Sequence, residues 1–329
     1  MNVSADLIQS YSALLTMACL PILIGSFLAR HKPSHSETLS QKDVFMFPVI
    51  GSVVLFSLYL CFKFLPKEWL NYLLQIYFAL LGIGAVFKVL NPLVSRIVPY
   101  SWTKKAKSEV QLPFSTITNY LFEIKTVQIT LTRIISFVFA ASVGLFYFQT
   151  KHWVANNIFG EAFSISSIEL ISLGSFTNGA ILLIGLFFYD IFWVFGTEVM
   201  VTVAKSFDAP IKLIWPRAQG YSLLGLGDIV IPGIFVAQML RFDDHLRRTN
   251  PSHGNIYFWT CFVSYILGLV ATVAVLTIFQ AGQPALLYLV PACLGSVTLL
   301  ALVRGEIKEL FAYSDAPDAP ATEKTKRSD

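Results

Sequence analysis

Two aspartates inside apolar stretches constrain this chain more than any other feature. Asp190 lies in the run 185–196, whose other members are glycines and apolar or aromatic residues, and Asp228 ends the sequence Gly-Leu-Gly-Asp just before the apolar run 229–235. A carboxylate costs several kcal/mol to place in lipid, so such residues face a protein interior or a wet cavity. Two of them on successive apolar segments predict a shared site.

Composition supports a membrane setting for these acids. Of the 329 residues, 55% are hydrophobic and only 13% are charged, and the mean hydropathy is +0.64. These values exclude a soluble globular domain and a disordered chain and indicate a polytopic membrane protein. The formal charge of +4 is too small to imply a nucleic-acid partner. The cysteines lack metal-ligand spacing and no HExxH motif occurs, so we expect neither a metal nor a cofactor.

The apolar runs predict an all-α fold with nine transmembrane helices. Each run is near the roughly 20 residues that a helix needs to cross the hydrocarbon core. The runs lie at about 7–28, 44–65, 69–90, 129–148, 154–173, 180–201, 221–240, 257–279 and 284–303. The first run is too long for a signal-peptide core and lacks a basic leader, so we expect it to be retained. The prediction is one membrane domain over 1–311 and a disordered cytosolic tail over 312–329.

The basic residues predict the orientation. With nine spans, the side reached by the C-terminus collects 17 of the 24 lysines and arginines and the N-terminal side collects six, while Arg133 lies inside the fourth run. The richer side is expected to be cytosolic, which places the N-terminus in a lumen or outside. The link 91–127 is then a solvated cytosolic connection. The sequon at Asn2 faces the lumen but lies too close to the membrane for us to expect its use.

Paired carboxyls on adjacent antiparallel helices suit amide hydrolysis. The link between the two runs has only about 20 residues, so we expect the helices to be neighbours. Two carboxyls a few ångströms apart do not both ionise cheaply, and the pair carries one proton over a wide pH range. The ionised member can take a proton from water while the protonated member donates to the scissile carbonyl. Asp190 and Asp228 are therefore the candidate catalytic pair.

Three neighbouring features do not indicate a site when each is taken alone. Gly225 and Gly227, with Leu226 between them, allow close backbone approach beside Asp228, but small residues also serve ordinary helix packing in membranes. Tyr189 could aim its hydroxyl at the site or only pack. The sequence Gln283-Pro284-Ala285-Leu286 has a proline at the start of the last run, which by itself is an ordinary helix-start signal.

Taken together, the Tyr-Asp, Gly-Leu-Gly-Asp and Pro-Ala-Leu motifs resemble those of the presenilin-type intramembrane aspartyl proteases. The stretches 157–160, 185–196, 203–207, 209–213 and 224–235 are similar to the signal peptide peptidase family in particular. The resemblance is dense over 156–242, resumes at Pro284, and is thinner over the first 150 residues. It implies a presenilin-like helical bundle, catalysis by Asp190 and Asp228, and site shaping by Pro284, Ala285 and Leu286.

The resemblance also implies substrates, a location and partners. It implies an endoplasmic reticulum enzyme that cleaves spent signal peptides and other type II-oriented membrane segments. A homo-oligomer is expected by resemblance only. The C-terminal sequence Lys326-Arg327-Ser328-Asp329 is similar to a dibasic retrieval signal of that compartment, although Arg327 replaces the preferred lysine.

Two other classes of function also fit a helical bundle with paired acids. A transporter or channel uses such acids to relay protons or bind cations, and the ordered set of three motifs argues against it. An inactive chaperone that only holds membrane segments would bind them without cleaving. Arg133, Glu169 and Glu198 are interpreted as structural residues of the bundle.

Overall fold

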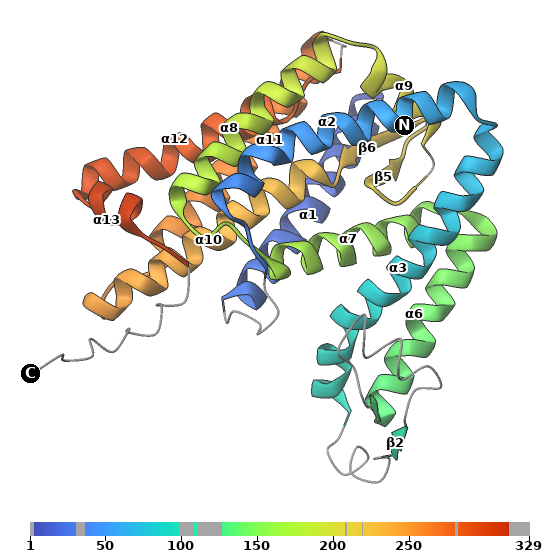
Figure 1. Ribbon diagram of the computed structural model, residues 1–329, viewed down its shortest axis with the longest axis horizontal. Coiled ribbons are helices and arrows are strands. Elements are labelled where there is room, and N and C mark those ends of the chain that lie inside the picture. The colour runs from blue at the N-terminus through green and yellow to red at the C-terminus, as the bar shows by residue number, and fades with distance from the viewer. Residues whose placement is uncertain are drawn as a thin grey trace, which may run out of the picture.

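The computed structural model describes residues 3–30, 37–98, 108–110, 127–207, 209–218, 220–279 and 282–315 (Figure 1). Helices account for most of these residues. The long helices are α1 (Val3–Ala29), α2 (Gln41–Phe64), α3 (Lys67–Ile97), α6 (Leu131–Thr150), α7 (Trp153–Leu170), α8 (Phe176–Phe195), α10 (Gly227–Thr249), α11 (Ile256–Phe279) and α12 (Leu286–Arg304). Two short helices are α9 (Val199–Ser206) and α13 (Ile307–Ala312).

Each predicted run contains a long helix, but hydropathy supports fewer spans than predicted. Within the described residues, seven helices are long and apolar enough to cross a membrane, and α7 and α10 are not among them. Both of these helices carry polar side chains and are largely buried by other helices. The fold is thus a mostly helical, multi-pass membrane protein, and nine transmembrane helices remain a prediction.

Short strands modify the predicted all-α class. They form three two-stranded sheets: β1 (Glu37–Thr38) with β4 (Ile171–Ser172), β2 (Ser108–Val110) with β3 (Val127–Ile129), and β5 (Lys212–Pro216) with β6 (Tyr221–Gly225). The first sheet is parallel, and the other two are antiparallel. The third matters most, because it leads directly into Asp228.

The boundaries of both predicted catalytic helices are corrected. The run 180–201 is not one helix: α8 ends at Phe195, and α9 begins only at Val199. The run 221–240 begins as strand β6, and α10 starts at Gly227 and continues to Thr249. Residues 221–225 pair with β5 because a turn at Gly220, with a φ of 81°, folds the chain back into a hairpin.

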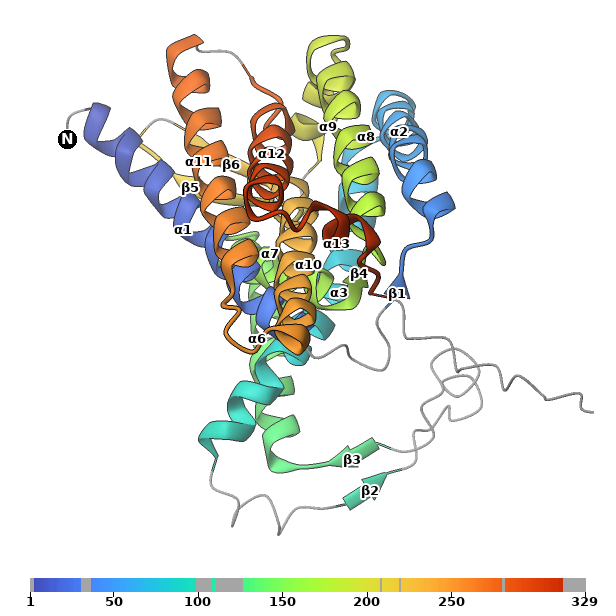
Figure 2. The same cartoon turned by 90° about the vertical axis from the view of Figure 1, so that its left-hand side faces the viewer.

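Helix α10 forms the centre of the bundle. All residues from 232 to 243 are buried, and α10 packs against α1, α7, α8, α11 and α12. Figure 2 shows these helices grouped around α10, whereas α3 and α6 form an antiparallel pair that extends to one side. A helix buried on every side does not need an apolar surface for lipid, which explains its low hydropathy.

Polar contacts at the helix ends agree with alternating helix directions. Lys88 pairs with Glu169 at 2.8 Å, so the C-terminal part of α3 meets the C-terminal end of α7. At the ends of α1 and α10, Arg30 pairs with Asp244 at 2.7 Å. Each pair joins residues that the predicted topology places on the same side, and the Lys88 contact gives Glu169 the structural role expected for it.

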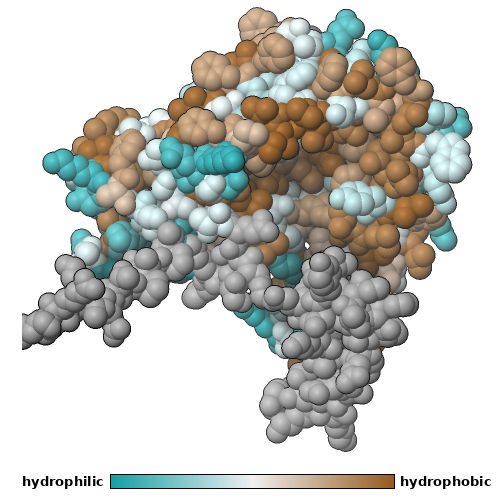
Figure 3. Space-filling view, viewed as in Figure 1, coloured by the Kyte–Doolittle hydropathy of each residue, from teal (hydrophilic) through white to brown (hydrophobic). Residues whose placement is uncertain are grey.

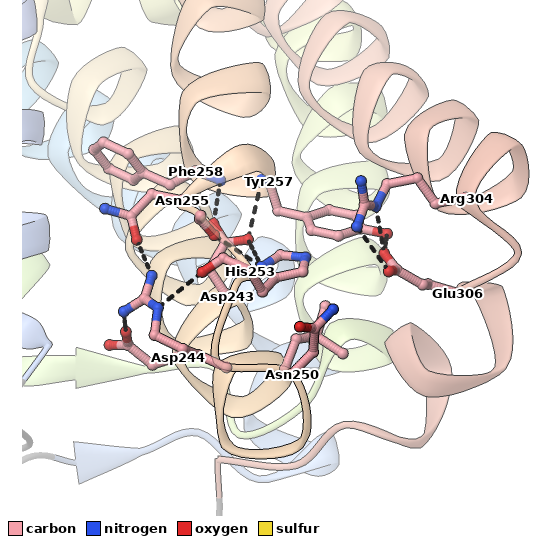
Figure 4. A network of polar contacts seen from close by, with 12 residues as sticks. Asp243, Asp244, Asn250, His253, Asn255, Tyr257, Phe258, Arg304 and Glu306 are labelled. Atoms are coloured by element: carbon pink, nitrogen blue, oxygen red, sulfur yellow. Dashed lines mark hydrogen bonds and ion pairs between the residues drawn. The ribbon is translucent and has the colours of Figure 1, made fainter.

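A second network fixes the start of α11 to α10 (Figure 4). The buried Asp243 carboxylate accepts hydrogen bonds from the backbone N–H groups of Tyr257, at 3.1 Å, and Phe258, at 2.8 Å. These two groups lie in the first turn of α11 and have no partner within that helix. The Tyr257 hydroxyl in turn donates to Glu306 at 2.7 Å. The network therefore connects α10, α11 and the segment after α12.

The outer surface suits lipid. In the face drawn in Figure 3, hydrophobic residues dominate the upper part of the molecule. Large apolar side chains remain exposed on α2, α3 and α6, such as Phe56, Leu80 and Phe137. An exposed apolar surface of this extent is expected on a helix bundle that faces hydrocarbon.

Three terminal and link predictions fall wholly or partly outside the described residues. Asn2 and the dibasic C-terminal sequence lie outside them, as do 99–107 and 111–126 of the link. At the start of the link, α3 continues to Ile97, seven residues past the predicted end. The predicted tail over 312–329 begins within the packed structure, since Tyr313 and Asp315 are buried.

Candidate active site

Helix α8 presents Asp190 to the bundle interior. Ile184, Phe188 and Phe192 recur every four residues and are about half exposed or more, so they form an outward stripe. Asp190 lies on the opposite, buried face and is 5% exposed. The apolar helix around this acid therefore has two different faces. One face is exposed on the outside of the bundle, and the other packs in the interior and holds the carboxyl group.

Asp228 is placed by a different device, the β5–β6 hairpin. Strand β6 ends at Gly225, and Leu226 occupies the N-cap position of α10. Asp228 lies in the first turn of that helix. A Cβ atom on Gly225 would lie 3.3 Å from an oxygen of Asp228. The missing side chain at Gly225 therefore leaves room for the carboxylate, which supports the close-approach interpretation at this glycine. A Cβ atom on Gly227 would meet nothing within 4 Å, so no close approach requires a glycine there.

Two buried asparagines of α7 hold this hairpin. The Asn157 amide pairs with both backbone groups of Ile214 in β5, donating at 2.7 Å and accepting at 2.8 Å. Asn156 donates to the Lys212 carbonyl at 2.8 Å. Together they satisfy the outer edge of β5 as a neighbouring strand would. Sequence reasoning missed this role, although two adjacent asparagines in an apolar run were a signal for it.

The Pro-Ala-Leu sequence brings the start of α12 to Asp190. The backbone N–H of Leu286 donates to Asp190 at 3.1 Å. Leu286 is the first residue of α12, so this N–H has no partner within the helix. Pro284 lies at the entrance of this helix, as expected, and α12 begins two residues after the predicted start at about 284. The three predicted motifs thus meet in space.

The two carboxyl groups share one electrostatic environment. Both lie near the start of α12, because Asp190 accepts from the Leu286 N–H and Asp228 borders a cavity that Ala285 also lines. Each carboxyl group also lies beside a helix N-terminus. Asp228 is in the first turn of α10, and the Asp190 carboxyl group accepts from the first N–H of α12. A helix N-terminus favours a negative charge, whereas two adjacent carboxylates repel each other. This balance favours a single shared negative charge, as acid–base chemistry on an amide requires.

A cavity of about 480 Å³ borders Asp228. Its walls come from α1, β6, α11 and the segment before α12, and most of them are apolar. The polar members of the lining include Asp228, Gln283, Tyr11, Ser12, Thr272 and Thr277. A mostly apolar chamber with a few polar groups beside a carboxyl is a suitable place for a hydrophobic peptide segment.

The remaining predicted site residues divide between the site and its support. Gln283 lines the cavity, and its side-chain oxygen accepts from the Tyr288 hydroxyl at 3.3 Å. The Tyr189 ring and hydroxyl pack beside Gly51 of α2, which favours the packing interpretation of this residue. Leu226 packs against Gly160 of α7. Ala285 and Leu286 are buried beside Asp190.

Fold and site together define a polytopic membrane protein with one buried aspartate and one cavity-lining aspartate, both near the start of α12. Comparison with known proteins then gives the family. The model of the signal peptide peptidase family matches residues 31–317. Signal peptide peptidase of Mus musculus is 44% identical over 95% of this chain and 85% of its own length, and that of Homo sapiens is 43% identical over the same shares.

A more distant relative agrees with this result. A probable intramembrane protease of Schizosaccharomyces pombe is 36% identical over 90% of both chains. The chain belongs to the signal peptide peptidase family. It is therefore an intramembrane protease, which decides against the transporter and against the inactive chaperone.

Proposed function

We propose that the chain is an aspartic endopeptidase that cleaves membrane-spanning helices with water activated by Asp190 and Asp228. The observation that carries this proposal is the meeting of three motifs at the start of α12: Asp190 accepts a hydrogen bond from the N–H of Leu286, and Asp228 lines one cavity with Ala285. Family membership supports the reaction class, and the geometry supports the assignment of residues.

In the proposed reaction the dyad holds one proton. The ionised aspartate removes a proton from a water molecule as its oxygen attacks the scissile carbonyl carbon. The protonated aspartate gives its proton to the carbonyl oxygen, which forms a tetrahedral diol. The proton gained from water then passes to the amide nitrogen, while the other, now ionised aspartate takes back a proton from a diol hydroxyl. The C–N bond breaks to leave a carboxylic acid and an amine, and the dyad again holds one proton. No metal or cofactor takes part in this proposal.

Substrate binding is proposed along β6. The outer edge of β5 is occupied by Asn156 and Asn157, whereas no strand pairs with the outer edge of β6 in the described part of the chain. An extended peptide that added to β6 would run toward Asp228 and toward Pro284. A helical substrate must unwind first, so helix-weakening residues near the scissile bond should favour cleavage.

The natural substrates are proposed from the family name and the predicted topology. The relatives are named signal peptide peptidases, so signal-peptide remnants and other type II membrane segments are the proposed substrates. The excess of basic residues on the C-terminal side supports a cytosolic position for that side and a lumenal or outside N-terminus. The endoplasmic reticulum is proposed as the compartment from the family resemblance. A homo-oligomer is proposed on family resemblance.

The test is cleavage of a labelled signal-peptide helix by purified protein in liposomes. We expect wild type to cleave and Asp190→Asn and Asp228→Asn to bind without cleaving. A matched control is Asp244→Asn, which removes a carboxylate farther along α10. If either dyad variant cleaves at the wild-type rate, the assignment fails; if cleavage occurs only with an added metal ion, the proposed reaction fails.

A further inference from the structure

The chain folds back on itself after α13. Residues 313–315, which we call the C-terminal strap, run beside the link between α7 and α8. The Asp315 N–H donates to the Gly174 carbonyl at 2.6 Å, and Ser314 forms an antiparallel bridge with Ser175. The strap thus adds a short strand-like contact directly before α8.

The Asp315 side chain is the buried end of this strap. Its carboxylate is 2% exposed and accepts from Arg241 Nε at 2.8 Å and from the Ser172 hydroxyl at 3.0 Å. Tyr313 donates its hydroxyl to the other carboxylate oxygen. Arg241 is itself only 7% exposed. A buried ion pair of this kind adds little net stability compared with apolar packing, but it strongly constrains geometry.

The partners of Asp315 belong to the elements that carry the site. Ser172 lies just before α8, which carries Asp190, and Arg241 lies on α10, which carries Asp228. The strap itself continues from α12 through α13, and α12 donates to Asp190. One carboxylate therefore connects all three site-bearing helices.

The connection acts at a distance from the dyad. Arg241 is 13 residues beyond Asp228, and Asp190 is 15 residues beyond Ser175. At 1.5 Å per residue, both helices span about 20 Å between the strap and the site. Figure 1 shows the hairpin and α13 at opposite ends of α10. A change of tilt at the strap end must therefore move the carboxyls relative to each other.

We propose that Asp315, acting through Arg241 and Ser172, is a positioning residue that sets the spacing of the Asp190–Asp228 pair. This inference rests on the proposed function. It assigns the C-terminal strap a part in catalysis although it lies about 20 Å from the reacting atoms.

The rest of the α10 end supplies a control. Asp244 also anchors this end, through Arg30 of α1 and Arg247 of α10 itself, but none of its described contacts reaches α8. Figure 4 shows Asp244 beside the network that holds α11. Loss of Asp244 should loosen the same end of α10 without breaking its connection to α8.

The experiment compares Asp315→Asn with Asp244→Asn in the full-length chain, as the pH profile of signal-peptide cleavage in liposomes. For Asp315→Asn we expect a fall in kcat of about 10- to 100-fold, because small misplacements of reacting groups are costly, with KM changed little. The acidic and basic limbs of the variant's pH profile should also move toward each other, because the coupling between the two aspartates weakens as they separate. Asp244→Asn should keep the wild-type profile.

A merely structural role gives a different result. Loss of folded protein lowers the amount of active enzyme but leaves the limbs of the profile in place. If Asp315→Asn does not accumulate, Asp315→Glu keeps the charge, lengthens the connection and should give the same narrowing. A wild-type profile in the variant that folds would overturn the strap proposal. Cleavage that survives Asp190→Asn would overturn the proposed function as well.

Discussion

The two helices that carry the aspartates solve the same problem in opposite ways. Helix α8 is strongly apolar, turns one face outward and keeps Asp190 on the other. Helix α10 has low hydropathy, is enclosed by five other helices and carries Asp228 in its first turn, directly after a strand. One acid therefore lies in the C-terminal half of an apolar helix, and the other lies at the beginning of a buried helix.

The difference shows what each acid depends on. Asp190 needs only an apolar helix and a neighbour, here the start of α12, to receive it. Asp228 needs the hairpin, the glycine that leaves room for it, and the asparagines that hold the hairpin against α7. We therefore expect perturbations around α10 to be more damaging than equivalent perturbations on the outward face of α8.

The largest effect is expected on the cleavage rate when either aspartate is replaced, and it should be similar for the two helices. Asp190→Asn and Asp228→Asn should each lower the rate of peptide cleavage by about 10²- to 10⁴-fold, the usual contribution of an acid–base group. Single-turnover cleavage in liposomes measures this effect. A variant that keeps more than about a tenth of the activity would show that its helix does not supply a reacting group.

The hairpin should be the weaker point on the α10 side. Asn157→Leu removes the side-chain partner of both half-buried backbone groups of Ile214, at a cost of up to about 1–3 kcal/mol for each group. We expect lower cleavage activity together with a lower thermal midpoint. Asn91→Leu on α3 is the matched control, because the side-chain amide oxygen of Asn91 is buried without a described partner. Equal losses in both variants would contradict the special role of the hairpin.

Packing around α10 should tolerate little added volume. A Cβ at Gly233 would lie 2.6 Å from Ile168, so Gly233→Val should destabilise the bundle by about 1–3 kcal/mol through overpacking. Gly84→Val on α3 is the control, since a Cβ there meets nothing within 4 Å. Thermal unfolding in detergent compares them, and equal midpoints would mean that α10 can shift to accept the side chain.

A smaller, pH-dependent effect is expected at the end of α12. The Arg304 guanidinium, followed by the Tyr257 hydroxyl, lowers the pKa of Glu306 below its ordinary value of 4.5. A lowered pKa contributes stability above the ordinary value that is lost as pH falls through the folded-state value. Glu306→Gln should therefore be less stable than wild type near neutral pH, and the gap should close below about pH 4.5. Thermal unfolding across this range measures it, and a constant gap would contradict the prediction.

The smallest effect is expected on the outward face of α8. Phe188 is 64% exposed, so Phe188→Ala should change stability by no more than about 0.5 kcal/mol. Leu186→Ala, two residues away on the buried face, should cost about 2–5 kcal/mol. If the two variants unfold at the same temperature, the division of α8 into an outer and an inner face is wrong.

Much of the architecture was accessible from local sequence. A continuous apolar run is sufficient to predict a membrane helix, because in lipid every backbone group must be satisfied within the segment. Asp190 and Asp228 were recognisable for the same reason, since a carboxyl group in such a run needs a special environment. The ordered motifs around them indicated the family, and the comparisons confirmed it.

The tertiary structure decided which groups meet. The strand before Asp228 has the sequence of an apolar run, and only its pairing with β5, which Asn157 holds on the other edge, makes it a strand. The N–H that reaches Asp190 comes from 96 residues further along the chain, and the carboxylate that binds Arg241 from 74 residues further along. Hydropathy describes which surroundings each segment favours. It does not specify which distant segment will supply those surroundings, because that depends on how all the helices pack together.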